Sequence, residues 1–159
     1  MKAEPAERLD SRAITLWRIT GLLNMLPLLV VAGFASLALL RFGDVASFVG
    51  ILPVLAVLAL AGFVIGVAPG LRWRRWRYEI RPDEVDLQRG ILWISRTLVP
   101  LARIQHVDTR QGPLQRRFGL STVVFYTAAG PNQIPELSTP VAEEARDRIA
   151  ELTREQDEL

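Results

Sequence analysis

The chain of 159 residues is too apolar for an ordinary soluble domain, because half of its residues are hydrophobic and its mean hydropathy is positive. It has no cysteine and a single histidine, His106, which excludes disulfides and zinc sites built from cysteine and histidine. The net charge of +2 hides an uneven distribution: residues 72–117 hold eleven arginines against five acids, and residues 118–159 hold three against eight. We therefore expect membrane insertion, with no metal and no cofactor.

The first half of the chain predicts two membrane-spanning helices behind a short polar leader. Residues 1–18 are polar and are interpreted as a cytosolic leader. Residues 19–40 form an uncharged run of 22 residues, which as a helix spans about 33 Å and matches a bilayer core. After a polar turn at residues 41–44, residues 45–71 form a second uncharged run of 27 residues. We therefore expect a transmembrane helical hairpin over residues 19–71.

Two other interpretations fit the apolar runs less well. A cleaved signal peptide has a shorter apolar core and is not followed by a second span. Two core helices of a soluble protein must be covered on all sides, and the 88 remaining residues are too few for that. Within the runs, two pairs of small residues let helices approach closely, which favours packing inside the hairpin over a dimer seam. These pairs are Gly62 with Gly66 and Ala32 with Ser36.

The placement of arginine predicts the orientation of the hairpin. Arg12 and Arg18 precede the first run and residues 72–77 follow the second, whereas the connecting turn has only Arg41. Positively charged flanks stay on the cytoplasmic side of a membrane. We therefore expect a multi-pass protein of the cell membrane, with both termini and the C-terminal domain in the cytoplasm.

After residue 71 the pattern changes to short alternating segments that are typical of strands. Strands are expected at residues 73–80, 85–89, 91–99, 101–107, 120–127 and 133–137, with a helical turn at residues 114–118. One face of a following amphipathic helix is formed by Val141, Ala145, Ile149 and Leu152. The fold class predicted for residues 72–153 is a mainly β, α+β domain, and residues 154–159 are expected to form a charged tail.

Residues 72–77 mark the boundary between the apolar and the alternating parts of the chain. The candidate membrane-interface or lipid-binding residues are Arg72, Trp73, Arg74, Arg75, Trp76, Arg77, Arg116 and Arg117. Arginine is attracted to an anionic leaflet by about 1 kcal/mol per residue, and tryptophan suits the headgroup layer. Trp73, Trp76 and Tyr78 are expected to anchor the first strand at the bilayer surface. Residues 72–77 also serve as a topology signal, and the sequence does not separate this role from lipid recognition.

Residues 100–120 read PLARIQHVDTRQGPLQRRFGL and resemble the YdbS-like family of bacterial membrane proteins with a pleckstrin-homology-like (PH-like) domain. The motif residues are Arg103, Ile104, Gln105, His106, Val107, Gly112, Phe118 and Gly119. The resemblance covers essentially the whole chain. It implies two nearly orthogonal antiparallel sheets with seven strands, closed at one corner by the C-terminal helix, on the cytoplasmic side. Because the pattern above gives six strands, one short strand is left to be found, near Leu114 or elsewhere.

The titratable residues do not favour catalysis. Asp108 lies two residues from His106 on the same face of a strand, but no nucleophile converges on the pair, so a structural histidine is favoured. No phosphate-binding loop or serine elbow occurs, and no small-molecule substrate is evident. Members of the family lack an established enzymatic activity, so the resemblance also implies a role that is not enzymatic.

Two functions of different classes remain. The favoured one is an interaction or assembly module at the membrane surface, which binds a membrane-protein partner or a second copy of the chain. The alternative is a sensor of anionic lipid headgroups or of the membrane surface, which uses the basic residues named above. Nucleic acid is not an expected partner, because a site at the bilayer surface cannot wrap a duplex.

Overall fold

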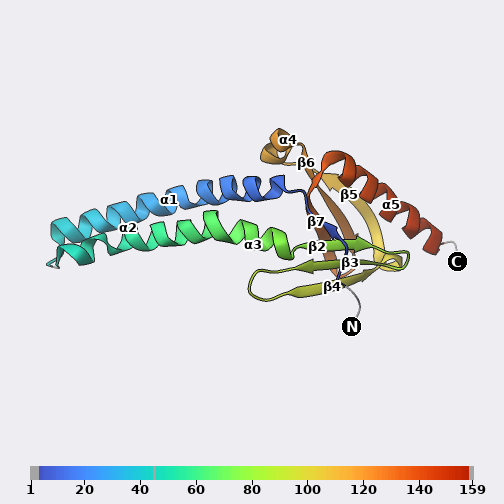
Figure 1. Cartoon of the computed structure of the whole chain (residues 1–159), viewed down its shortest axis with the longest axis horizontal. Coiled ribbons are helices and arrows are strands. Elements are labelled where there is room, and N and C mark those ends of the chain that lie inside the picture. Colours follow the sequence, from blue (N-terminus) through green and yellow to red (C-terminus); the bar gives the residue numbers. More distant parts are fainter. Residues whose placement is uncertain (1–3, 45, 158–159) are drawn as a thin grey trace. The chain divides into compact units, whose positions relative to one another are not determined.

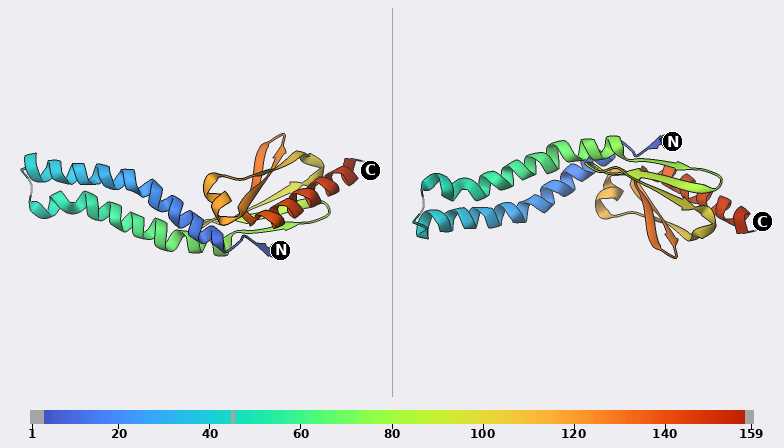
Figure 2. Two further views of the ribbon diagram at one scale, coloured as in Figure 1. Left: turned by 90° about the horizontal axis from the view of Figure 1, so that it is seen from above. Right: turned by 90° about the horizontal axis from the view of Figure 1, so that it is seen from below.

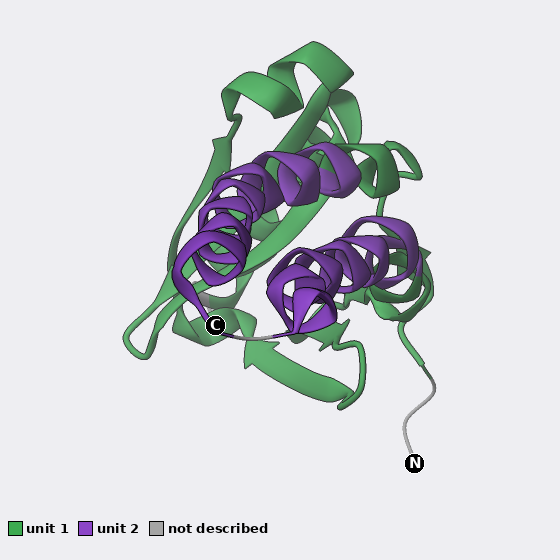
Figure 3. Ribbon diagram, turned by 90° about the vertical axis from the view of Figure 1, so that its left-hand side faces the viewer, with its two compact units in different colours: residues 1–16, 71–159 green, residues 17–70 purple. Residues whose placement is uncertain are grey.

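A computed structural model describes residues 4–44 and 46–157 and divides the chain into two compact units (Figure 3). The helical unit comprises residues 17–70, and the sheet unit joins residues 1–16 to residues 71–159. The chain therefore begins in the sheet unit, passes through the helical unit and returns.

The helical unit contains two long apolar helices. The first is α1 (Arg12–Phe42); the second combines α2 (Ser47–Ala61), the π-helical segment η1 (Gly62–Val67) and α3 (Ala68–Arg75). They have 31 and 29 residues, and only 11% and 6% of their most apolar stretches are buried. Val31 and Phe34, for example, are 64% and 70% exposed. Helices that are apolar on every side are suited to lipid, as the expected transmembrane hairpin requires.

Small residues allow the two helices to lie against each other, side by side in both views of Figure 2. A Cβ added at Gly50 would lie 2.4 Å from Leu40 Cδ2, and one at Gly21 would lie 3.4 Å from Val64. Ala32 and Ser36 are buried, as expected for packing inside the hairpin. Gly62 and Gly66 have no neighbour within 4 Å of an added Cβ, so the expectation that this second pair packs inside the hairpin is wrong.

Both helices extend past the uncharged runs. At the start of α1, the Asp10 carboxylate accepts a hydrogen bond of 2.9 Å from the backbone N–H of Arg12 and caps the helix. At the other end, the Trp76 N–H donates to the Arg72 carbonyl at 2.9 Å, so residues 72–75 are helical and not, as expected, largely strand. Hydropathy marks the part that lipid solvates, whereas backbone hydrogen bonds and caps decide where a helix ends.

The first sheet has four antiparallel strands in the order β1-β2-β3-β4. They are β1 (Glu7–Arg8), β2 (Arg77–Ile80), β3 (Glu84–Arg89) and β4 (Ser95–Pro100). Strand β1 is the seventh strand that the pattern missed; Glu7 lies opposite Tyr78 and Arg8 opposite Arg77. Residue Leu114 lies in a helix instead. Part of the polar segment that we interpreted as a leader therefore completes the sheet.

The second sheet has three antiparallel strands, and a helix covers it (Figure 1). The strands are β5 (Ile104–Arg110), β6 (Leu120–Thr127) and β7 (Gly130–Ser138), and the short helices beside them are η2 (Leu101–Arg103) and α4 (Pro113–Phe118). Helix α5 (Thr139–Asp157) includes residues 154–157, which we had expected in a charged tail; residues 158–159 lie outside the described part. The expected fold class, two apolar helices followed by two antiparallel sheets and a C-terminal helix, is confirmed.

The core of the sheet unit lies between the two sheets and α5. Its fully buried side chains include Val85, Leu87, Leu101, Leu120, Val123, Phe125, Ile134, Leu137 and Ile149. On α5 the buried face carries Ala142, Ala145 and Ile149, while Val141 is 41% exposed. At the start of α5 the buried position is therefore Ala142 and not Val141, as we had expected.

Candidate functional site

The aromatic residues of the junction, residues 72–77, pack within the sheet unit. Trp76 is 3% exposed and the neighbouring Tyr78 is 4% exposed. The indole N–H of Trp73 donates to the backbone carbonyls of Leu9, at 3.0 Å, and of Asp10, at 3.1 Å. The guanidinium carbon of Arg8 lies 5.6 Å from the centroid of the Trp73 ring. Trp76 and Tyr78 therefore contribute to the core, and Trp73 fastens the N-terminal segment to the end of α3.

The arginines of the junction differ in exposure. Arg72 and Arg74 are exposed on the last turns of α3, and Arg75 and Arg77 are half-buried. Arg77 Nε lies 3.7 Å from Glu4 Oε2. Because Glu4 is largely exposed and the two groups are 3.7 Å apart, this ion pair contributes little to stability.

The fold brings the second pair of basic candidates, Arg116 and Arg117, to the same end of the sheet unit. Both are exposed on α4. At the C-terminal end of α4, the Phe118 carbonyl accepts a hydrogen bond of 2.8 Å from Arg12 Nη1. Arg12 begins α1 directly after β1, and β1 pairs with β2 next to the junction. Basic residues about forty positions apart are therefore gathered where the chain leaves and re-enters the sheet unit.

Arg12 also sets the charge state of its neighbour. Its guanidinium donates to both carboxylate oxygens of Asp10, at 3.0 and 2.9 Å. These side-chain hydrogen bonds, more than any other influence, lower the pKa of Asp10 below its ordinary value. Asp10 thus remains ionised and able to cap α1.

Three of the family-motif residues shape the connection between β5 and β6. Gly119 has φ +64°, a left-handed conformation that suits glycine, and it ends α4. Its carbonyl accepts a hydrogen bond of 3.0 Å from the Thr139 N–H at the start of α5. At the other end of α4, the Gly112 N–H donates to Gln115 Oε1 at 3.0 Å. Gly112, Phe118 and Gly119 therefore have structural contacts that hold α4 in place.

The motif histidine lies on the surface of the second sheet. His106 Nε2 is 2.8 Å from Asp108 Oδ2, and the two side chains are 57% and 49% exposed. The His106 ring stacks on Tyr126, with ring centroids 4.5 Å apart, and Arg110 donates to the Tyr126 hydroxyl. Register explains the cluster, because His106 lies opposite Tyr126 and alternate residues of β5 share a face. The partners of His106 are thus a carboxylate on its own strand and the tyrosine ring opposite it, as the register of the two strands requires.

A buried carboxylate fixes the hairpin of β3 and β4. Asp86 on β3 is fully buried and accepts hydrogen bonds from Arg96 on β4, at 3.0 Å from Nε and 2.5 Å from Nη2. A second guanidinium, that of Arg81, lies 3.5 Å from the same carboxylate. The hydrogen bonds to Asp86 raise the pKa of Arg96 above its ordinary value. The pair is bidentate, which fixes the relative position of the two strands as well as linking them.

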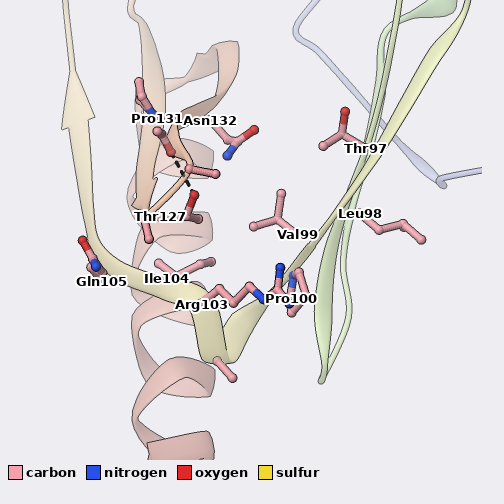
Figure 4. A pocket seen from close by; sticks show the side chains of 14 residues that line it. Thr97, Leu98, Val99, Pro100, Arg103, Ile104, Gln105, Thr127, Pro131 and Asn132 are labelled. Carbon is pink, nitrogen blue, oxygen red and sulfur yellow. Dashed lines mark hydrogen bonds between the residues drawn. The ribbon is translucent and has the colours of Figure 1, made fainter.

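A groove of about 650 Å³ runs between β4 and the hairpin of β6 and β7 (Figure 4). Thr97 and Val99 point into it from β4, and Pro131 and Asn132 lie on its opposite side. The motif residues Arg103, Ile104 and Gln105 line its base; Arg103 and Gln105 are exposed, and Ile104 is buried. The motif residue Val107 is half-buried farther along β5.

The base of the groove, at residues 100–105, lies at the end of the sheet unit opposite the junction. The Leu101 N–H, just after β4, donates at 3.0 Å to the Asp83 carbonyl in the turn between β2 and β3. That turn follows Ile80, at the far end of β2 from the junction. The sheet unit therefore has a basic end, which continues into the apolar helices, and a grooved end.

One exposed feature was missed in the sequence. The β3–β4 tip, residues 90–94, forms the loop between these strands, and Leu92, Trp93 and Ile94 are 77%, 84% and 56% exposed. We had expected strand from residue 91 onward. The available signal was the run of five residues from Gly90 to Ile94 that contains no polar side chain, whereas a half-buried strand alternates apolar with polar residues.

Comparisons with known proteins agree with this architecture. The family model described as "Bacterial PH domain" matches residues 26–153. The chain belongs to the bacterial PH domain family. The family resemblance of residues 100–120 is thereby confirmed. In residues 4–44 and 46–157, no group of three or more His, Asp or Glu side chains is placed to hold a metal ion.

Two curated proteins that are similar to this chain are transmembrane proteins of Bacillus subtilis (strain 168). The UPF0699 transmembrane protein YdbS is 34% identical over 161 residues, which cover 99% of each chain. The UPF0699 transmembrane protein YdbT is 28% identical over 81 residues, 51% of this chain and 16% of its own length. No solved structure gives a significant match. Together with the two apolar helices, these relatives show a membrane-associated protein with a PH-like domain.

Proposed function

We propose that the protein is a membrane-anchored interaction module that binds an extended segment of a membrane-protein partner in the groove along β4. The observation that carries the proposal is that the groove follows a sheet edge: β4 pairs with β3, and no strand of the described residues pairs with its other side. Edge strands offer backbone donors and acceptors to an added strand, and adjacent pockets select its side chains.

The groove residues suit binding better than catalysis. The apolar Val99 and Ile104 lie beside the polar Arg103, Gln105 and Asn132, an arrangement that supports recognition of a peptide with mixed side chains. None of these five is a common nucleophile or general base. The module is therefore proposed to act without an enzymatic activity.

The proposal is tested by crosslinking from within the groove. A photoreactive benzoylphenylalanine at Gln105, exposed in the groove, is expected to capture a discrete protein in native membranes, whereas one at Glu155, exposed on α5, is not. Asn132→Trp fills the groove and should abolish the crosslink. Gln133→Trp is the matched control, because the next residue of β7 points to the opposite face of the sheet.

Three results would contradict the groove as the binding site. They are equal capture from Gln105 and Glu155, capture of lipid alone, and capture that persists in Asn132→Trp. A captured species of twice the chain mass of 17.8 kDa identifies the partner as a second copy, and the module then serves self-assembly.

A second function, contact with anionic lipid, is favoured by the position of α4. The hydrogen bond between Arg12 and the Phe118 carbonyl gathers Arg116 and Arg117 near the junction arginines. The summed attraction of Arg74, Arg116 and Arg117 to an anionic leaflet is about 3 kcal/mol, at about 1 kcal/mol for each exposed arginine. This supports a headgroup-binding surface distinct from the groove.

Native mass spectrometry of the full chain tests this second function. Arg116→Glu with Arg117→Glu should reduce the amount of phosphatidylglycerol that stays bound and leave phosphatidylcholine unchanged. Arg148→Glu with Arg154→Glu, on α5, is the charge-matched control. The full chain is needed, because a fragment that begins at residue 72 lacks strand β1. Equal loss in both double variants would count against a headgroup site on α4.

We also propose that both termini lie in the cytoplasm, because the basic residues flank the outer ends of the two helices. The absence of cysteine makes the test direct. With a membrane-impermeant maleimide added to whole cells, Asp44→Cys should be labelled and Glu155→Cys should not. Labelling of position 155 alone would reverse the orientation.

A further inference from the structure

We propose that the β3–β4 tip inserts into the same membrane that holds the helical unit, as an apolar contact separate from the arginines. Among the described residues, the large apolar side chains more than 40% exposed outside the two candidate spans are Leu92, Trp93, Ile94, Leu98 and Val141. Three of the five are consecutive at the tip. A contiguous, exposed apolar segment of this kind marks an interaction site more often than scattered exposed residues do.

The tip is a turn with a defined backbone conformation. Gly90 has φ +140°, and a Cβ at this position would lie 1.8 Å from the Trp93 carbonyl oxygen, so only glycine fits. On the adjoining strands, the bidentate pair of Asp86 and Arg96 joins β3 to β4. The three apolar side chains are therefore carried on a hairpin that is fixed at its base.

The sheet register places the tip at the end of the sheet unit that continues into the helices. Arg77 is the first residue of β2 and lies opposite Gln88, and the next residue of β3, Arg89, lies opposite Ser95 and opens the tip. Figure 1 shows the loop beyond this end of the sheet. At about 3.3 Å per residue, Leu92 to Ile94 reach roughly 7–10 Å beyond the level of Arg77. A headgroup layer is about 5–7 Å thick in each leaflet.

The chemistry of the tip identifies lipid as its occupant. Leucine and isoleucine partition into the acyl region, and tryptophan prefers the boundary between acyl chains and headgroups. Arg89 is exposed at the base of the tip and is placed to meet phosphate. The chain passes between the apolar helices and the sheet unit at this end of the sheet unit, so the bilayer that holds the helices is the proposed occupant and no further partner is needed.

Depth-dependent quenching on the full chain in phosphatidylcholine vesicles tests the proposal. An environment-sensitive NBD label at Leu92→Cys leaves Trp93 in place, and Glu155→Cys is the control. Gln156, next to the control, donates to the Pro82 carbonyl at the opposite end of the sheet unit. We expect the label at position 92 to be quenched several-fold more by lipids with a nitroxide near the headgroup, and several-fold less by aqueous iodide.

Two further variants separate this contact from the others. Trp93→Asp with Ile94→Asp, in the Leu92→Cys background, should reduce lipid quenching to the level of the control without changing the unfolding midpoint. Arg74→Glu with Arg75→Glu should leave the quenching intact, because the contact is apolar and the vesicles are uncharged. The insertion of the tip is therefore tested independently of the headgroup site on α4, and loss of that site would not affect it.

Several outcomes would overturn the proposal. Equal lipid quenching at positions 92 and 155 places the tip in water. Quenching that survives the double aspartate variant is not due to the apolar side chains. Protection from iodide that rises with protein density, without lipid quenching, shows contact between copies of the chain.

Discussion

The junction and the β3–β4 tip both carry tryptophan at the same end of the sheet unit, but their rings have opposite environments. At the junction Trp76 is 3% exposed, and the Trp73 N–H is satisfied by two backbone carbonyls. At the tip Trp93 is 84% exposed. A tryptophan in an arginine-rich segment is therefore not by itself a membrane anchor. The rest of the fold decides whether its ring is buried and its N–H already hydrogen-bonded.

The largest expected effect is on stability, and it comes from removing a tryptophan ring at the junction. Trp76→Ala removes a buried ring and leaves a cavity, and it should lower the free energy of unfolding by about 3–5 kcal/mol. Thermal or chemical unfolding of the full chain in detergent, followed by near-ultraviolet circular dichroism, measures the change. If Trp76→Ala and Trp93→Ala cost the same, the contrast between junction and tip is wrong.

Alkaline pH should reveal the next effect, at Tyr78. Burial, its main cause, raises the pKa of Tyr78 to about 12 from an ordinary value of 10.0. Stability is complete below pH 10 and decreases as the pH rises toward 12, because only the unfolded state then readily loses the proton. The loss approaches about 3 kcal/mol at 1.36 kcal/mol per pKa unit. Tyr78→Phe should flatten this part of a plot of unfolding free energy against pH, relative to the native chain.

A smaller effect is expected at Trp73. Trp73→Phe keeps an aromatic ring but removes the N–H that links α3 to the N-terminal segment, at a cost of about 1 kcal/mol. Hydrogen exchange at residues 7–10 should increase in this variant, because β1 is held partly by that link. Unchanged exchange there would mean that the pairing of β1 with β2 holds the segment without Trp73.

The smallest effect on stability is expected at the tip. Trp93→Ala should change the free energy of unfolding by no more than about 0.5 kcal/mol, because an exposed side chain loses little packing. The variant should nevertheless reduce lipid quenching of a label at position 92. A large loss of stability in detergent would show that Trp93 belongs to the core after all.

Much of the fold could be predicted because its signals are local. Long uncharged runs indicate the two helices, and the period-two pattern at residues 120–127 indicates β6, whose bounds were predicted correctly. The family motif correctly indicated seven strands and a closing helix. Strand β1 escaped because it has two residues, Glu7 and Arg8, and is formed by pairing with a segment about 70 positions away. No periodicity exists in two residues.

The candidate site could be predicted only as a list of residue types. The arginines at positions 72–77 and 116–117 were recognised by charge, but nothing in the sequence shows that Arg12 reaches the Phe118 carbonyl and gathers them at one end. The groove along β4 was not foreseen either, because a sheet edge and the hairpin facing it are distant in the chain. Lipid recognition by these arginines and binding in the groove remain proposals.

The sequence by itself determined the membrane-spanning character and the order of the elements, because hydropathy and local periodicity act within a few residues. Tertiary structure alone decided which of the aromatic residues at the membrane end are free. Trp76 and Tyr78 are covered by strands and helices, whereas Trp93 stands on a turn that nothing in the sheet unit covers. Burial depends on which distant parts of the chain pack against a residue, and the residues next to it in the sequence do not determine that.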